Sequence, residues 1–246
     1  MIKFFRRIRQ NLIMENKTSK YFKYAIGEII LVVIGILIAL QINNWNESRK
    51  TDNKRSELIA SLIEDFDYNK NEIKIELKFR DSLLKNMDTF DELIKSDTQR
   101  VTVDSLRTLA DSFFRGHSFS PNLTAYDQAK STGNLSLLNR KIVLQKFTKF
   151  VEANDGLKAL NDEGRYSFFN GSSWEFRKTV DLTLIEGLTP IANAPTYKDY
   201  KAMVSTPLAK AALGNSSSIN WNMKNRLKIM NDATKEILEL LNDMKN

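Results

Sequence analysis

The sequence predicts an all-α protein with one N-terminal transmembrane helix, followed by an extracytoplasmic helical bundle with long heptad-patterned helices. A basic arm precedes a continuous apolar segment, and apolar residues recur every three or four positions at both ends of the remaining chain. No segment alternates apolar and polar residues as a half-buried strand would. The predicted parts are a basic cytoplasmic arm (1–23), a transmembrane helix (24–42) and an extracytoplasmic all-α domain (43–246).

The positive charge is concentrated in the first 23 residues. The formal net charge is +7, and seven Lys or Arg residues against Glu15 give this arm +6 of it. A nucleic-acid binder carries its charge on the folded domain, so we do not expect nucleic acid as a partner. Membrane lipid is the expected partner, because anionic headgroups attract Lys and Arg. The first 14 residues are either an amphipathic helix on the inner leaflet or a disordered basic retention signal.

The apolar segment runs over 19 residues from Tyr24 to Ile42 and is interrupted only by Glu28 and Gln41. As a helix it would span about 28 Å, close to the hydrocarbon thickness of a bilayer. Its twelve Ile, Leu and Val residues favour insertion by about 5 kcal/mol, which exceeds the cost of one carboxylate near the helix end. No small-residue cleavage site follows, so we expect an uncleaved signal-anchor.

The flanks of this segment predict its orientation. The Lys and Arg excess on its N-terminal side places the N-terminus in the cytoplasm. Aromatic residues, which favour the membrane–water interface, stand at both ends: Tyr21 and Tyr24 at the entry, and Trp45 at the exit. These three residues are the expected interfacial anchors.

Residues 20–47, KYFKYAIGEIILVVIGILIALQINNWNE, resemble the opening of a bacterial family of single-pass membrane proteins described as a domain of unknown function. Residues 126–138 resemble, less closely, that family's internal Leu-x-x-Ser-Gly-Asn-Leu pattern, from which Ala129 and Thr132 depart. The resemblance implies a cell-envelope protein with one span. With the predicted orientation, we expect it in the bacterial inner membrane with its C-terminal domain in the periplasm. The resemblance implies no activity, cofactor or catalytic residue.

Small residues lie on one ridge of the expected span, which consists of Gly27, Leu31, Gly35 and Ala39. Such ridges let two helices approach closely, so we predict transmembrane association there. The alternative is that Gly and Ala are merely common in spans. Glu28, the intramembrane polar residue, is either an interfacial carboxylate reaching towards Lys23 or headgroups, or an intramembrane contact or proton-linked site.

A heptad pattern predicts a long packed helix from about residue 50 to 95. One line of positions holds Ile59, Phe66, Ile73, Arg80, Met87 and Ile94, and the other holds Ile63, Lys70, Leu77, Leu84 and Asp91. Eight of these eleven residues are apolar. The charged residues between the lines, such as Lys74, Glu76 and Lys78, are expected on the solvated face.

A second apolar line predicts the C-terminal helix, with Ser218 as its N-cap. Its members are Met223, Leu227, Met230, Thr234, Ile237, Leu241 and Met244. Shorter helices are expected over 104–114 and 196–213, and another from Ser120-Pro121 to Gly133. A long helical stretch over 136–186 contains three glycines that can divide it (Gly156, Gly164 and Gly171), and residues 190–195 form a turn.

The sequence contains no recognisable catalytic, cofactor-binding or metal-binding motif. It has no cysteine and one histidine, His117, which is expected to be an exposed loop residue. It has no GxSxG, P-loop or GxGxxG pattern, and Thr132-Gly133-Asn134 predicts a helix end with Gly at C′. We therefore expect no enzyme activity, no cofactor and no metal.

Two classes of function stay open. The preferred hypothesis is a membrane-anchored interaction or scaffold module, whose partner is a second copy of the chain or another envelope protein. The alternative is a sensor or carrier of a small ligand or lipid. Its aromatic-lined cavity would be formed by Tyr166, Phe169, Trp174 and Phe176, with Phe168 beside them, although these side chains equally suit core packing.

Overall fold

The computed structural model of the protein describes residues 18–96, 102–181, 184–185 and 195–245. All regular secondary structure in these ranges is helical, so the predicted all-α class is confirmed. The elements are α2 (Thr18–Lys95), α3 (Val103–Asp111), α4 (Thr124–Ser131), the 3-10 helix η1 (Asn134–Leu138), α5 (Lys141–Phe169), α6 (Ser172–Arg177), α7 (Tyr197–Ser205) and α8 (Pro207–Lys245). Most of the basic arm, and residues 190–194 of the expected turn at 190–195, lie outside the described residues.

The chain divides into two compact units, Met1–Glu57 and Leu58–Asn246. The first unit contains the N-terminal part of α2. Among the described residues, α2 is the one helix that is long and apolar enough to cross a membrane. Its Ile, Leu and Val side chains from Ile29 to Ile42 are exposed, as expected for a segment whose solvent is lipid.

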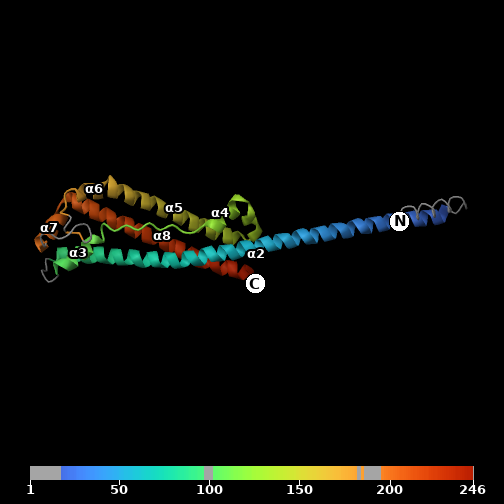
Figure 1. The fold of residues 1–246 in the computed structure, drawn as a ribbon, viewed down its shortest axis with the longest axis horizontal. Coiled ribbons are helices and arrows are strands. Elements are labelled where there is room, and N and C mark those ends of the chain that lie inside the picture. The colour runs from blue at the N-terminus through green and yellow to red at the C-terminus, as the bar shows by residue number, and fades with distance from the viewer. Residues whose placement is uncertain (1–17, 97–101, 182–183, 186–194, 246) are drawn as a thin grey trace. The chain divides into compact units, whose positions relative to one another are not determined.

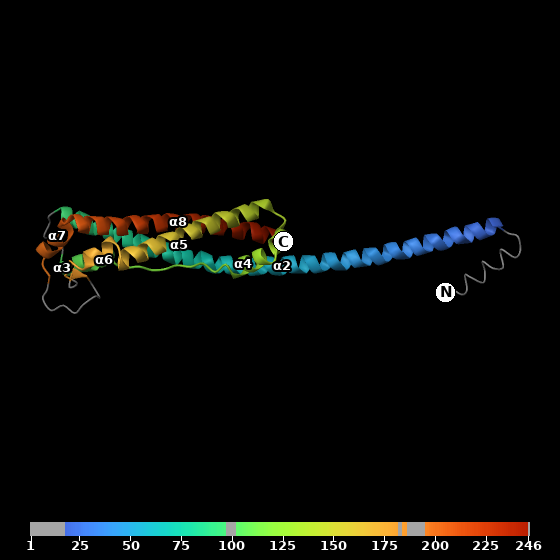
Figure 2. The ribbon, with the colours of Figure 1, turned by 90° about the horizontal axis from the view of Figure 1, so that it is seen from above.

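Three long segments build the second unit: residues 58–95 of α2, α5 and α8. Figures 1 and 2 show α5 and α8 side by side in opposite directions, with α3, α6 and α7 at one end and α4 at the other. Proline suits the first turn of a helix because its missing N–H needs no partner there. Pro207 accordingly begins α8, and Thr206 Oγ1 caps it by accepting a hydrogen bond from the Ala209 amide at 3.1 Å.

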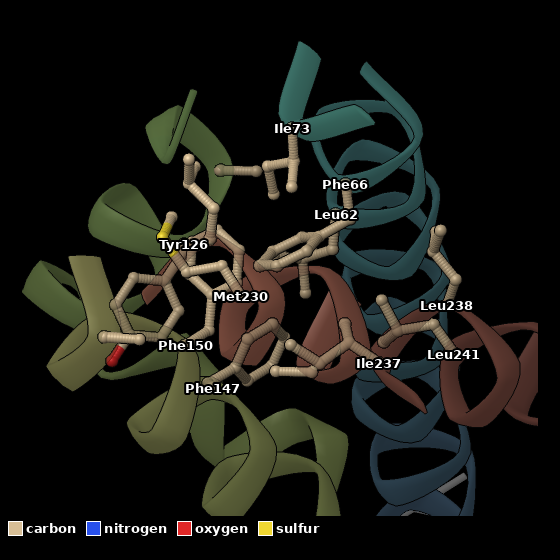
Figure 3. Close-up of a cluster of buried hydrophobic side chains, with 14 of the residues drawn as sticks. Leu62, Phe66, Ile73, Tyr126, Phe147, Phe150, Met230, Ile237, Leu238 and Leu241 are labelled. Atoms are coloured by element: carbon tan, nitrogen blue, oxygen red, sulfur yellow. The ribbon is translucent and has the colours of Figure 1, made fainter. Parts of the chain in front are cut away.

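Two hydrophobic clusters stabilise the second unit. The larger joins α2, α4, α5 and α8, and its side chains interdigitate in Figure 3. Phe66 is fully buried there, with its ring centroid 5.4 Å from that of Phe147 and 5.1 Å from that of Phe150. The smaller cluster joins the end of α2 to α3, α6, α7 and the start of α8 around Phe90, Phe176 and Tyr200.

One predicted line of α2 residues, from Ile59 to Ile94, is buried throughout, but the second line differs from the prediction. Its members are half-buried or exposed, and the buried residues are instead Leu62, Asn69, Glu76, Leu83 and Phe90. The expectation that Glu76 is solvated is therefore wrong, since only 3% of this residue is exposed. Asn69 and Glu76 can be buried because polar groups from another segment form hydrogen bonds with them.

Several helix boundaries differ from the predicted ones. Ser218 lies inside α8 and is not its N-cap, because the preceding polar turn stays helical. That turn is held by tertiary hydrogen bonds: Ser216 Oγ donates to the Phe113 carbonyl at 2.8 Å, and Asn215 Nδ2 donates to Ser167 Oγ at 3.1 Å. The helix expected over 196–213 is divided between α7 and α8, and α4 begins three residues later than Pro121.

Two glycines lie where the backbone geometry favours glycine. Gly133 follows α4 with φ 74°, the left-handed C′ conformation that the sequence predicts. At Gly171 a Cβ would lie 2.9 Å from the Ser167 Cα, so the close approach of α5 and α6 requires glycine. Gly156 and Gly164 lie within α5 and do not interrupt it.

Candidate functional site

An extended segment, residues 115–123, links α3 to α4 and is here named the strap. Figures 1 and 2 show it running along the long helices. Phe119 is its buried apolar residue and joins the larger cluster. Because the strap has no regular secondary structure, the backbone polar groups in its buried part need partners from other segments.

Polar residues of α2 supply those partners near the end of the strap. Asn69 Nδ2 donates to the Asn122 carbonyl at 2.6 Å, and the Asn122 amide donates to Asn69 Oδ1 at 2.7 Å. Asp65 accepts from Asn122 Nδ2 through one oxygen and from the Ala125 amide through the other, both at 2.7 Å. Since Leu123 provides no side-chain cap, the Asp65 carboxylate acts as the anionic cap of α4.

A buried ionic network holds the start of the strap. Arg80 Nε donates to Glu76 Oε1 at 2.8 Å, Nη1 donates to Asn220 Oδ1 at 2.7 Å, and Nη2 donates to the His117 carbonyl. Glu76 Oε2 lies 2.7 Å from His117 Nδ1. The Glu76 and Arg80 side chains are each 3% exposed, so hydrogen bonds on all sides are needed to offset their desolvation.

The network lies between the two hydrophobic clusters. Along α2, Glu76 and Arg80 fall after Ile73 of the larger cluster and before Phe90 of the smaller one. Asn220 of α8 completes the layer and donates from Nδ2 to the Ser216 carbonyl at 2.9 Å. Polar groups that pair only in one alignment can set the register of packed helices, and we expect this layer to do so.

A pocket of about 420 Å³ opens beside the network. Arg80, His117 and Asn220 contribute to its lining, together with residues 113–118, the end of α5 and the middle of α8. Its apolar wall consists of Phe113, Phe114, Leu160, Phe168, Phe169, Ile219 and Met223. This volume and this mixture of aromatic and convergent polar groups are typical of small-molecule sites.

The charged groups of the lining are cationic: Arg80, Arg115 and Arg165. Arg80 is paired with Glu76, and Arg115 is paired with Asp111. Arg165, on α5, is exposed and forms no ion pair with any side chain in the described part of the chain. No Asp or Glu is among the lining residues, so the charge of Arg165 is the positive charge of the lining that no carboxylate balances.

The four aromatic residues expected at a cavity are placed in different environments. Phe169 lines the pocket, whereas Tyr166 and Trp174 are exposed outside its lining. Phe176 is buried in the smaller cluster and stacks on Phe114, with 6.1 Å between ring centroids. Phe168 also lines the pocket, and the Arg177 guanidinium lies 3.6 Å from its ring centroid.

His117 is 61% exposed at its side chain, yet it is bonded to Glu76 and lines the pocket. Its ring also packs edge-on against Phe79, with centroids 5.7 Å apart. Sequence reasoning missed this contact and the whole set of polar residues beneath the strap. Arg80, a charged residue inside a predicted apolar line of the long helix, was the available signal.

The expected span residues lie on α2 in the first unit. Gly27, Leu31, Gly35 and Ala39 share one helix, and a Cβ at Gly27 or Gly35 would meet no atom within 4 Å. Glu28 is partly buried and interacts with another residue of the chain. Trp45 is exposed, and the Arg49 guanidinium lies 5.9 Å from its ring centroid. The side chains of Tyr21 and Tyr24 are outside the part of the chain that the structure describes.

Comparison with protein families identifies the group to which the sequence is related. The model of a family of unknown function (DUF6090) matches residues 28–163, more than half of the chain. The chain belongs to this family. The DUF6090 match includes Asp65, Asn69, Glu76, Arg80 and His117, and ends in α5 before Arg165. Searches of curated proteins and of solved structures found no match.

Proposed function

We propose that this chain is a membrane-anchored binding module whose second unit holds a small ligand in the pocket. The observation that carries this proposal is the pocket itself, which is lined by Arg80, His117 and Asn220 of the hydrogen-bonded network. Preformed concave sites with an aromatic wall and a few fixed polar groups are the usual places for small ligands. The anchor is the apolar segment of α2, with the N-terminus in the cytoplasm and the helical unit in the bacterial periplasm.

Binding is favoured over catalysis by what surrounds His117. Its Nδ1 is engaged with Glu76, and the hydrogen bonds of the described residues join no serine or threonine hydroxyl to its ring. A nucleophile activated by histidine needs such a bond. The Glu76–His117 pair thus holds the strap against α2 and shapes the pocket.

The test fills the pocket without disturbing the core. Gly164 lines the pocket, and a Cβ there would meet Ile219 Cγ2 at 3.8 Å, which is ordinary contact. Gly164→Leu therefore directs its added carbons into the pocket volume while improving helix propensity. Gly214→Leu is the matched control, since Gly214 lies on α8, has open space around a Cβ and does not line this pocket.

Full-length wild type, G164L and G214L would be isolated in nanodiscs and their small-molecule extracts compared by mass spectrometry. We expect a compound that is enriched with wild type and G214L and depleted with G164L. A metabolite panel screened by thermal shift provides a second readout. Identical extracts, together with identical thermal shifts for wild type and G164L, would contradict ligand binding in this pocket.

A second candidate function is association through the span, as a self-associating or partner-binding scaffold. It is favoured by the ridge of small residues Gly27, Gly35 and Ala39 on α2, which would let a second helix approach the backbone. Gly35→Leu combined with Ala39→Leu should lower energy transfer between labelled chains in vesicles, and Val33→Leu should not. Unchanged energy transfer in the double variant would show that the span does not take part in association.

A further inference from the structure

We propose that the pocket selects an amphiphilic organic anion, with Arg165 binding its charged group and the aromatic wall enclosing its apolar body. This inference rests on the proposed ligand-binding function and names the ligand class. Such an anion can be a soluble carboxylic acid or a single-chain acidic lipid. Both share one negative group attached to an apolar chain or ring.

The apolar part of the ligand follows from the pocket wall. Phe113 and Phe114 precede the strap, Phe168 and Phe169 end α5, and Met223 comes from α8. Phe169 is 59% exposed although it is one of the largest apolar side chains. A ligand whose apolar body covers this ring would remove that surface from water, which is favourable in proportion to the area buried.

The sign of the charge follows from the lining. Arg80, Arg115 and Arg165 line the pocket, and no carboxylate lines it. Arg80 and Arg115 are already paired with Glu76 and Asp111. An ammonium ligand would therefore be repelled by the Arg165 guanidinium, which is unpaired within the described residues, without any lining carboxylate to offset it. A carboxylate would be attracted, and attraction strengthens as the ligand displaces water from the pocket.

Arg165 is the guanidinium available to a ligand. The donors of Arg80 are directed to Glu76, Asn220 and the His117 carbonyl. Arg115 is engaged with Asp111. Arg165 forms no ion pair within the described ranges, and its planar fork matches a carboxylate in two-pronged geometry.

The volume limits the size of the anion. At roughly 30 Å³ per water-sized group, the pocket of about 420 Å³ accommodates an eight-carbon acid with its carboxylate. Octanoate is therefore a suitable probe. Octanamide keeps its length and removes the charge, and octylammonium reverses the charge.

The experiment is calorimetric titration of the three probes into the full-length chain in zwitterionic nanodiscs, with empty nanodiscs as the blank. We expect octanoate to bind most tightly. Arg165→Gln should weaken octanoate about tenfold, the scale of one charge-assisted hydrogen bond, and leave octanamide unchanged. Arg140→Gln is the matched control, because Arg140 is an exposed arginine at the other end of α5 and lies outside the pocket.

A second arm identifies the source of the anion. A single-chain acidic lipid, lysophosphatidylglycerol, is placed in the nanodisc, and hydrogen exchange is followed over residues 160–169. Protection by the lipid alone supports a membrane-derived anion, and protection by octanoate supports a soluble acid. The failure of both probes to bind or protect would overturn the anion inference.

Two further outcomes would also overturn it. Octanamide that binds as well as octanoate, with both lost in Gly164→Leu, would show an apolar pocket without charge selection. Equal weakening by Arg165→Gln and Arg140→Gln would show a long-range effect of net charge. The extract comparison of G164L and G214L separately decides whether the pocket holds any ligand, so the two failures are distinguishable.

Discussion

Asn69 and Asn122 hydrogen-bond in both directions, with the Asn69 side chain satisfying the backbone N–H and C=O of Asn122 at 2.7 and 2.6 Å. A side-chain amide has one donor end and one acceptor end, so it can imitate the backbone of a neighbouring strand. Asn69 is fully buried, and this pairing lets an extended segment pack on a helix without unsatisfied backbone groups.

Replacing Asn69 with Ala should lower the free energy of unfolding by about 2–3 kcal/mol, because both Asn122 backbone groups lose their partner. The measurement is denaturant unfolding of the full-length chain in micelles. Asn71→Ala is the control, since Asn71 is exposed on the same helix. A loss no larger than that of the control would show that water replaces the amide.

Replacing Arg80 with Met should destabilise the chain by about 3–5 kcal/mol, because the Glu76 carboxylate would stay buried without its cation. The double variant Glu76→Leu with Arg80→Met should lose less than the sum of the single variants. Lys78→Met serves as the control, because Lys78 is exposed. Additive losses in the unfolding measurement would mean that Glu76 and Arg80 do not act as a pair.

Replacing Phe66 with Ala should cost about 3–5 kcal/mol of unfolding free energy through lost burial and the resulting cavity. Phe66 contributes to the larger cluster from α2 and meets two rings of α5 (Figure 3). Tyr68→Ala is the control, because Tyr68 is 54% exposed. Equal unfolding midpoints for Phe66→Ala and Tyr68→Ala would show that Phe66 is not part of the stabilising core.

Burial raises the pKa of Tyr200 to about 12, and its hydroxyl donates to the Leu184 carbonyl at 3.0 Å. The unfolded phenol titrates near pH ~10. Because the folded pKa is the higher one, this contribution to stability is complete below pH ~10 and is lost as the pH rises towards about 12.

Ultraviolet titration of the seven tyrosines should therefore show one phenol that ionises last, together with unfolding. Tyr200→Phe should remove this late step, whereas Tyr68→Phe, at an exposed position, should leave it. A late step that persists in Tyr200→Phe would assign the protected phenol to another residue.

The fold class, the apolar segment and the approximate extent of the long helices follow from local pattern. The line from Met223 to Leu241 is buried as predicted, because helical periodicity and hydropathy are properties of neighbouring residues. Local pattern did not predict the second buried line of α2. Three of its five residues are apolar: the line consists of Leu62, Asn69, Glu76, Leu83 and Phe90. The predicted line, one position later, also has three apolar residues of five.

The candidate site was predictable only in part. Phe169 was named as a cavity residue, and it lines the pocket with Phe168. Trp174 and Phe176 are nearby in sequence, but the chain turns at Gly171, so Phe176 points into the smaller cluster. Arg165 carried no sequence signal, because its significance depends on the absence of a carboxylate among residues that only folding brings to the pocket.

Local sequence pattern was thus sufficient for the helical class and the candidate span, since both depend on hydrophobicity over a few turns. The tertiary structure decided which polar residues enter the interior. Asn69 meets a partner 53 residues away, Glu76 meets one 41 residues away, and Arg80 meets one 140 residues away. Burial of a polar group is tolerated only where a partner is supplied, and the folded chain alone brings these partners together.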